Sequence, residues 1–356
     1  MAFRPLRVAM FSTVRLNPYV SLLAAGIRAA TPEIQVTQFE RLSPAWLLRE
    51  GRPYAIMHLH WAELQYGAGS RRARLARFAS FAAALALGKL AGKRLVYTVH
   101  NLAQHEGRHE RLNRWTNRLL FAWADALHVH DAGVAAELER QTGRRRGVFV
   151  IPHGSYAGYY PDDITPAEAR RRLGLEADAF VYLNLGGLRP YKGVEELMRA
   201  FAALPAARLR LVIAGHPHEP DYAARLRALA AGDERIRLFL EHVPDARVQV
   251  YLRAADVCVF PYRQATTSGA AILALTFGRP IVAPALGPFP ALVAQSAGVV
   301  YAPDDPDGLR QALRQAQELD AGAAQRAIAA YVDCIAWPRL GRLHAGMYRQ
   351  LLSGQA

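Results

Sequence analysis

Cysteine is scarce in this chain of 356 residues, which contains only Cys258 and Cys334. Two cysteines exclude the disulfide framework of a small secreted protein. Both lie in segments with the pattern of a strand or a helix, so we expect two buried thiols in a reducing compartment. The cytoplasm is the expected location.

Long hydrophobic runs are also missing. The longest apolar stretch, "FASFAAALALG" at 78–88, is too short to span a bilayer, which takes roughly 20 such residues. The start, "MAFRPLRVAMFST", lacks the small-residue cleavage pattern of a signal peptide. We therefore expect a soluble chain or one that is peripheral at a membrane.

Acidic residues are few in the first half. The whole chain has a net charge of +14, and residues 1–162 hold 22 Lys and Arg against 11 Asp and Glu, a net +11 that leaves +3 for the rest. This asymmetry favours an anionic partner such as an acidic membrane face or a phosphorylated acceptor. A genome that favours arginine over lysine would also produce it. Zinc-ligand spacing, RNP-like aromatics and a recognition helix are absent, so we predict no nucleic-acid partner.

Short apolar runs alternate with amphipathic segments along the whole chain. This pattern is typical of an α/β protein with parallel sheets covered on both faces. The predicted strands are 6–13, 34–39, 54–60, 94–100, 125–130 and 147–152 in the first half and 180–187, 208–215, 236–243, 256–262, 279–285 and 297–303 in the second.

A domain boundary is predicted at 153–166, which is rich in Gly, Pro, Tyr and Asp and has no periodicity. The next helix has a clear start, because Thr165 can cap it, Pro166 suits its first turn and Glu168 can close a capping box. Two Rossmann-like domains suit a chain of this length.

Three predicted strands end in histidine, at His60, His100 and His130. Ligands of doubly wound sheets bind beyond the carboxyl ends of the strands, so these side chains are candidates for a site. The alternative is a set of buried histidines with satisfied hydrogen bonds.

The segment "LNLGGLRPYKGVEELMRAF" (183–201) runs from a strand through Gly186 and Gly187 into a loop with Arg189 and Lys192. A helix with apolar residues at helical spacing follows. Two cations at the mouth of a helix suit a diphosphate, because backbone amides, the helix dipole and both side chains attract anions. A loop with ordinary surface cations is the alternative.

The segment "ATTSGAAILALTFGRPIVAP" (265–284) places Thr266, Thr267, Ser268 and Gly269 before an apolar helix without any carboxylate. One hydroxyl can serve as the helix cap. The remaining hydroxyls and the free amides are candidate ligands of phosphate oxygens.

The segment at 183–201, followed in order by "LVIAGHPHEP" (211–220), "VPDARVQVYLRAADVCVFPY" (243–262) and "FGRPIVAP" (277–284), resembles the GT-B glycosyltransferases, in particular the large sugar-nucleotide family of bacterial polysaccharide enzymes. The resemblance covers most of 150–340. It implies two Rossmann-like domains facing a cleft, at 1–160 with a helix at 338–356 that returns past Trp337, and at 161–337. Together with the hydroxyl cluster, the candidate donor-binding residues are Gly186, Gly187, Arg189, Lys192, His216, Thr266, Thr267, Ser268 and Gly269.

In the first half, "VYTVHNLAQHE" (96–106) resembles the strand whose final histidine contacts the donor sugar, which assigns that role to His100. Acceptor contacts are expected from the neighbouring loop and from the loop after the first strand. The candidates are Arg15, Asn17, Tyr19, Asn101 and His105. If a general base is needed, it is expected to be Glu106 or Asp131, with Glu63 as a third choice.

The chain departs from the family at Ala265 and Leu273, where retaining members usually carry two glutamates. Neither side chain can accept a hydrogen bond. The resemblance therefore supports nucleotide-sugar binding but leaves the sugar and the anomeric outcome open. Some inverting GT-B enzymes that build lipid-linked sugars also resemble this chain in a short "HN" in the first half and a Ser-Gly cluster at this position.

Residues 71–94 combine arginines with an apolar middle in which Leu75, Phe78, Ala82 and Leu85 share one helical face. This helix could lie at a membrane surface or pack on the first domain's sheet.

We predict a glycosyltransferase that moves a hexose from a UDP- or GDP-sugar to a saccharide, such as a lipid-linked precursor of a bacterial surface polysaccharide, without a metal or other cofactor. The alternatives are a phosphorylase or epimerase on the same fold and a catalytically silent, membrane-peripheral assembly subunit.

Overall fold

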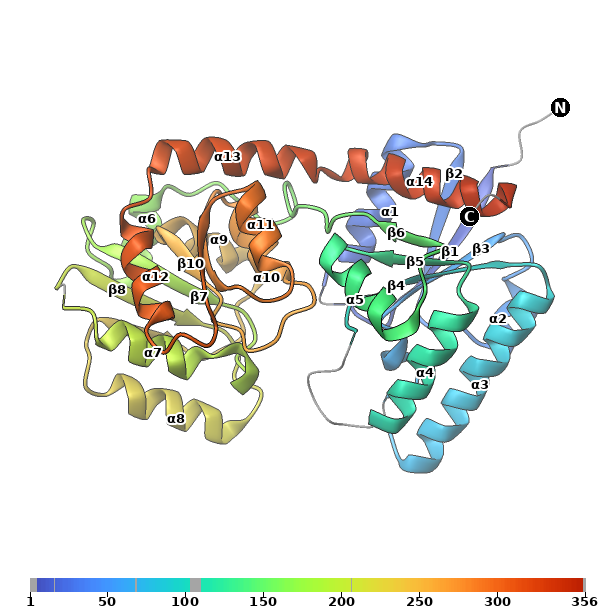
Figure 1. The fold of residues 1–356 in the computed structure, drawn as a ribbon, viewed down its shortest axis with the longest axis horizontal. Helices are drawn as coiled ribbons and strands as arrows, with labels where there is room; N and C mark the ends of the chain where they lie inside the picture. Colours follow the sequence, from blue (N-terminus) through green and yellow to red (C-terminus); the bar gives the residue numbers. More distant parts are fainter. Residues whose placement is uncertain (1–4, 16, 68, 103–109, 206, 355–356) are drawn as a thin grey trace. The chain divides into compact units, whose positions relative to one another are not determined.

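The protein contains two compact α/β units (Figure 1). The structure is a computed structural model that describes residues 5–15, 17–67, 69–102, 110–205 and 207–354. Unit 1 comprises Met1–Gly154 together with Ile335–Ala356, and unit 2 comprises Ser155–Cys334. Each unit has one parallel sheet of six strands, which confirms the predicted α/β fold of two Rossmann-like domains.

The sheet of unit 1 has the order β2-β1-β3-β4-β5-β6. Its strands are β1 (Leu6–Phe11), β2 (Ile34–Phe39), β3 (Ile56–His60), β4 (Arg94–Thr98), β5 (Ala126–Val129) and β6 (Val148–Val150). The chain runs outward from β1 in one direction and from β3 in the other. The point where the strand order reverses therefore lies between β1 and β3, and ligands of such sheets bind beside this point.

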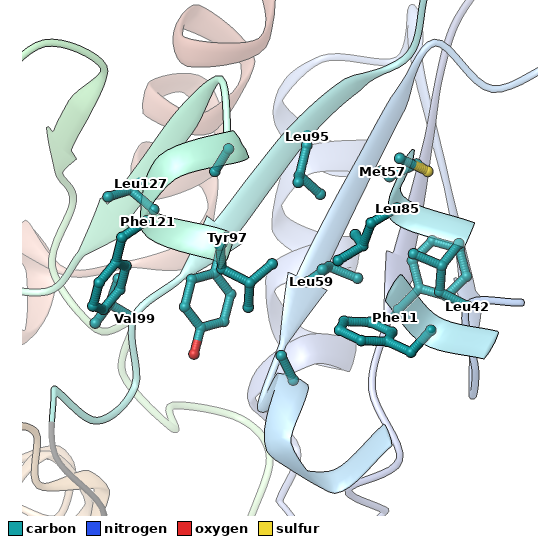
Figure 2. Packing of buried hydrophobic residues seen from close by; sticks show 14 of the residues in the cluster. Phe11, Leu42, Met57, Leu59, Leu85, Leu95, Tyr97, Val99, Phe121 and Leu127 are labelled. Atoms are coloured by element: carbon teal, nitrogen blue, oxygen red, sulfur yellow. The ribbon is translucent and has the colours of Figure 1, made fainter. Parts of the chain in front are cut away.

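Helices cover both faces of this sheet. They are α1 (Tyr19–Ala30), α2 (Pro44–Arg49), the 3-10 helix η1 (Ala62–Gln65), α3 (Arg71–Leu90), α4 (Glu110–Trp123), α5 (Ala132–Thr142) and α14 (Trp337–Ser353). Over β3, β4 and β5 one face is apolar and includes Leu59, Tyr97 and Leu127, which pack with Leu85 and Phe121 (Figure 2).

The opposite face of the same strands carries polar side chains, because successive residues of a strand point to opposite sides. His58, Thr98 and His128 alternate with the apolar residues of β3, β4 and β5, and all three are fully buried. The part of the sheet formed by β3, β4 and β5 therefore has one apolar face and one face lined by histidines.

Helices α1 and α14 cross at two glycines. A Cβ atom on Gly341 would overlap the carbonyl oxygen of Gly26, and a Cβ on Gly26 would lie 2.7 Å from the carbonyl oxygen of Trp337. A Cβ on Gly154 would overlap the Trp337 ring. The two backbones are therefore in direct contact, and the start of α14 is enclosed by glycines.

The sheet of unit 2 has the order β12-β11-β10-β7-β8-β9. Its strands are β7 (Phe180–Leu185), β8 (Leu209–Ala214), β9 (Ile236–Phe239), β10 (Val257–Val259), β11 (Ile281–Pro284) and β12 (Gly298–Tyr301). Its order reverses between β7 and β10, so the loops after these two strands flank the expected ligand position.

Helices surround this second sheet as well. They are α6 (Pro166–Leu173), η2 (Pro190–Lys192), α7 (Val194–Ala202), α8 (Pro220–Ala230), α9 (Asp245–Ala254), α10 (Gly269–Thr276), α11 (Phe289–Gln295), α12 (Gly308–Gln317) and α13 (Ala321–Cys334). The apolar face expected for α7 is confirmed, because Val194, Leu197, Met198 and Phe201 are all buried.

Each of the twelve predicted apolar runs contains one strand. The start of α6 is also confirmed, because the Thr165 hydroxyl accepts a hydrogen bond from the amide of Glu168 at 3.2 Å. The Glu168 side chain, however, forms ion pairs with Arg171 and Arg172. Nearby cations thus replace the reciprocal contact of a capping box.

One local expectation was wrong. Cys258 is buried, but Cys334 is exposed because it closes α13 at the surface. In α3, Leu85 is buried together with Phe81, Ala84 and Gly88, whereas Leu75 is exposed. In the described parts of the chain, every helix is too short or too polar to cross a membrane.

Candidate functional site

Glycines shape the loop that follows β7 at the reversal point of unit 2. Gly186 and Gly193 have φ angles of 133° and 68°, which side chains other than that of glycine rarely allow. A Cβ on Gly193 would overlap the carbonyl oxygen of Pro261, directly after β10. The glycines therefore let the loop carrying Arg189 and Lys192 lie against the end of the neighbouring strand.

The loop after β8 joins this arrangement through backbone hydrogen bonds. The amide of Leu188 donates to the carbonyl of His216 at 2.9 Å, and the amide of His218 donates to Leu188 at 3.1 Å. The structure thus brings His216 to the same edge as Gly186 and Gly187. Its side chain is exposed.

Lys192 is half-buried at this edge. Burial, and to a smaller extent the neighbouring Arg189 cation, lower the pKa of its ammonium to about 8. Its Nζ atom lies 5.5 Å from the centre of the Tyr262 ring, a cation–π contact. Arg189 and Lys192 are two adjacent cations, and one of them is partly removed from water. Together they attract an anion such as a diphosphate strongly.

The hydroxyl cluster lies at the start of α10, as expected. The Ser268 hydroxyl accepts a hydrogen bond from the amide of Ala271 at 3.2 Å and is the helix cap. Thr266 and Ser268 are buried, and Thr267 is half-buried. Gly269 is the first residue of the helix, and its amide is one of the first-turn amides that have no acceptor within the helix.

Tyr262 links the two parts of this site, and it was not predicted from the sequence. Its ring contacts Lys192, and its side chain lies beside that of Ser268. The available signal was its position three residues beyond the end of a central strand, where "FPY" leads into the hydroxyl cluster.

In unit 1, a hydrogen-bonded chain crosses the polar face of the sheet. The Ile151 carbonyl can only accept, so His128 donates to it through Nε2 at 2.9 Å and accepts at Nδ1 from the Thr98 hydroxyl at 3.0 Å. The Thr98 oxygen then accepts from His58 Nε2 at 2.8 Å. His58 Nδ1 accepts from the Tyr348 hydroxyl at 2.8 Å. This order fixes the tautomer of both histidines.

A second layer of histidines lies at the carboxyl edge. His60 Nδ1 is 3.3 Å from His100 Nε2, and His130 Nδ1 donates to the Ile151 carbonyl at 3.3 Å. The Nε2 atoms of His60 and His130 have no hydrogen-bond partner among the described residues. Burial lowers the pKa of His60 to about 3 and those of His100 and His130 well below their usual value, so all three are neutral.

Trp61 stacks on His100. The two ring centres are 3.8 Å apart and the planes differ by 9°. Tyr19 touches the His100 ring edge-on, with the ring centres 5.2 Å apart. Tyr19 is fully buried and also contacts His130 and Trp337, so it packs under the strand ends.

Two other candidate acceptor residues, Arg15 and Asn17, line a cavity of about 260 Å³ beyond the ends of β1 and β2. Arg15 forms an ion pair with Glu40, and the Asn17 side chain accepts from the Tyr19 amide at 3.0 Å. The Tyr19 side chain, in contrast, is buried and is not one of the described residues that line this cavity.

Asp131 caps α5, because its Oδ1 accepts from the Val134 amide at 2.9 Å. Its Oδ2 is buried with no hydrogen-bond partner in the described structure, and burial raises the pKa of the carboxyl. Burial also raises the pKa of Glu63 in η1.

Three further candidate residues remain. Asn101 is half-buried beside His100. His105 and Glu106 lie outside the described residues. Within residues 5–102 and 110–354, apart from 16, 68 and 206, no group of three or more His, Cys, Asp or Glu side chains could hold a metal.

Two glycosyltransferase family models match the chain. "Glycosyltransferase Family 4" matches residues 20–155 and "Glycosyl transferases group 1" matches residues 179–318. The GDP-mannose:glycolipid 4-beta-D-mannosyltransferase of Xanthomonas campestris pv. campestris is 30% identical over 353 residues, covering 99% of this chain and 94% of that protein. The D-inositol 3-phosphate glycosyltransferase of Streptomyces avermitilis is 30% identical over 247 residues, covering 64% of this chain and 52% of that protein.

Solved structures share the fold. The sucrose-phosphate synthase of Thermosynechococcus elongatus superimposes with a TM-score of 0.75 at 20% identity, covering 98% of this chain and 100% of that one. Anabaena Alr3699/HepE, in complex with UDP-glucose, superimposes with a TM-score of 0.74 at 17% identity over the same shares. The two family models, and the mannosyltransferase that matches over 99% of the chain, show that the chain is an enzyme. It belongs to the GT-B glycosyltransferases of the group 1 and family 4 type.

Proposed function

We propose that this enzyme transfers mannose from GDP-mannose to a glycolipid and forms a β-linkage. The observation that carries this proposal is the 30% identity to a GDP-mannose:glycolipid 4-beta-D-mannosyltransferase over 99% of the chain. That likeness includes unit 1, where the acceptor is expected, whereas the D-inositol 3-phosphate glycosyltransferase matches over only 64%.

The site in unit 2 supports the donor half of the proposal. Arg189 and Lys192 neutralise the diphosphate as it leaves, and the free amides at the start of α10 bind its oxygens. Ser268 and Tyr262 hold the two loops together. We propose that these groups replace the metal ion that other transferases use.

A β-linked product supports an inverting reaction, because the sugar of GDP-mannose is α-linked to its phosphate. Inversion requires a base that takes the proton of the attacking hydroxyl. Asp131 and Glu63 are the described candidates, and burial raises the pKa of both toward the working pH. Ala265 and Leu273, in place of carboxylates, are compatible with this route.

A surface of unit 1 supports the lipid-linked acceptor. Leu75, Leu87 and Leu90 of α3 and Trp115 and Trp123 of α4 are exposed, and both helices contact η1. Four arginines lie in the first two turns of α3. Apolar side chains among arginines suit an anionic bilayer surface. We propose that this surface brings the enzyme to its glycolipid.

The proposal is tested by incubating the enzyme with GDP-mannose or UDP-glucose and a lipid-linked oligosaccharide, with and without EDTA. We expect GDP release that depends on the acceptor and is unchanged by EDTA, and NMR of the product should show a β-mannoside. Acceptor-dependent turnover of UDP-glucose alone would refute the donor assignment, and an α-mannoside would refute inversion.

Membrane contact is tested by flotation with vesicles of phosphatidylglycerol and of phosphatidylcholine. We expect binding to the anionic vesicles and its loss in Leu90→Glu with Trp115→Glu, while GDP affinity stays unchanged. Equal binding of the double variant would refute this surface.

A further inference from the structure

We propose that Trp61 is a positioning residue, which holds the His100 imidazole in the orientation that the transferred sugar requires. The inference rests on the proposed function, which places His100 at the donor sugar. It assigns a role to a side chain outside the expected catalytic and binding residues.

The backbone of Trp61 is the first observation. Its φ angle is 45°, and among the described residues it is the one residue other than glycine with a positive φ. Such conformations are costly for bulky side chains and persist where the surroundings enforce them, often at functional sites. The chain needs this turn because β3 ends at His60 and η1 begins at Ala62. Glycine or asparagine would make the same turn at lower cost.

The side chain of Trp61 supplies what glycine cannot. Its ring lies flat on His100 at 3.8 Å and 9°, while Tyr19 meets the same imidazole edge-on from α1. His60 is 3.3 Å from His100 Nε2. The imidazole is thus held through one nitrogen, one face and one edge, which prevents rotation of the ring.

Two consecutive residues of β3 and its turn therefore act on the same histidine. His60 contacts it in the plane of the ring and Trp61 contacts it above the plane. The left-handed turn is what allows this, because consecutive side chains of a continuing strand would point to opposite faces of the sheet. The strained conformation and the stacked ring are thus parts of one arrangement.

The surroundings of His100 provide a readout beyond activity. The titratable groups that face it are Tyr19 of α1, His60 of β3, His128 and His130 at the end of β5, and His153 after β6. Burial and these neighbouring imidazoles lower the pKa of His100. Removal of the Trp61 ring admits water to one face, which raises that pKa toward its usual value.

The test compares Trp61→Asn, which suits the left-handed turn and lacks the ring, with Trp61→Phe, which restores a ring. Melting temperature, kcat, KM for GDP-mannose, and the pKa of the His100 ring by NMR titration are measured. For Trp61→Asn we expect no loss of melting temperature, a fall in kcat of roughly tenfold or more, an unchanged KM and a raised His100 pKa. Trp61→Phe should recover part of kcat.

Trp46→Phe is the matched control, because Trp46 is a buried tryptophan of the apolar face that contacts Phe11. It should lower the melting temperature and leave the His100 pKa unchanged. The inference would be overturned if Trp61→Asn kept the kcat and the His100 pKa of the wild type. It would also be overturned if kcat fell only because the variant has a lower melting temperature. If the wild type fails to use GDP-mannose, the proposed function fails, and the NMR titration still decides whether Trp61 controls His100.

Discussion

The ammonium of Lys192 has a pKa of about 8 because it is partly buried beside Arg189. Its charge is present below this pH and is lost as the pH rises through it. We therefore predict that the affinity for GDP, measured by calorimetry, weakens between pH 7 and pH 9.5. Lys192→Ala should lose about 10- to 100-fold in affinity at pH 7, the value of a charged hydrogen bond, and its affinity should no longer vary in that interval.

Lys192→Arg is the control, because a guanidinium stays charged at every pH in the interval. It should bind GDP with an affinity that does not fall toward pH 9.5. The same alkaline loss in both variants would assign the pH dependence to another group.

Thr98 supplies the hydroxyl between two buried imidazoles in the chain from Tyr348 to Ile151. Thr98→Val keeps the shape but leaves His58 Nε2 and His128 Nδ1 without a partner. Since each unpaired buried group costs about 1–3 kcal/mol, we predict a loss of about 2–6 kcal/mol in the free energy of unfolding of unit 1, measured in urea. Thr98→Ser should lose less, because it keeps the hydroxyl. Equal losses in both variants would contradict the directional chain.

The sequence predicted which residues stand at the strand ends, but not how they pair. His60, His100 and His130 were identified because they end apolar runs. Trp61 and Tyr262 were missed because each acts on a side chain far away in sequence. A strained φ or a ring stacked on a distant histidine leaves no periodic signal.

At the scale of elements, the crossing of α1 and α14 depends on backbone contact. Gly341→Ala would force a Cβ into the Gly26 carbonyl. We predict a cost of about 1–3 kcal/mol, typical of overpacking. Gly346 lies on the same helix, where an added Cβ would meet no atom within 4 Å, and its replacement by alanine should stabilise by about 0.5–1 kcal/mol. Urea titrations of both variants measure the difference, and a shift of the same sign would contradict the crossing.

All twelve strands could be predicted because strands of parallel sheets are buried on both faces and read as continuous apolar runs. Side-chain partners, and the burial of individual residues on helices such as α3, could not be predicted. Glu168 pairs with arginines instead of closing its helix cap, and the sequence left open whether Leu75 of α3 is buried on the sheet or exposed, as the structure has it. These details depend on neighbours that periodicity does not identify.

At the scale of the molecule, buried histidines are concentrated in unit 1. His58, His60, His100, His128, His130, His153 and His344 all have a lowered pKa, which is about 3 for His60 and about 4 for His153 and His344. In the unfolded chain each titrates near 6.5. The unfolded state therefore binds more protons below pH 6.5, and stability falls as the pH falls from there toward 4.

We predict that unit 1 unfolds first on acidification. Hydrogen exchange between pH 7 and pH 4.5 should show loss of protection in β3, β4 and β5 before β7 and β8, whose unit has no buried histidine among its described residues. The variant His344→Leu removes one such group and should shift the transition to lower pH. Simultaneous loss in both sheets would contradict the prediction.

Unit 1 is completed by α14, which supplies Tyr348 to the histidine chain although it follows the whole of unit 2 in the sequence. On the ribosome, at about 5–20 residues per second, roughly ten to thirty-five seconds pass between the synthesis of β6 and that of α14. During this interval the nascent sheet lacks the helix that contacts its histidine-lined face, and the whole of unit 2, up to Cys334, is synthesised. Unit 2 is translated second but is thus complete first. A stop codon shortly before Trp337 would leave unit 1 without α14.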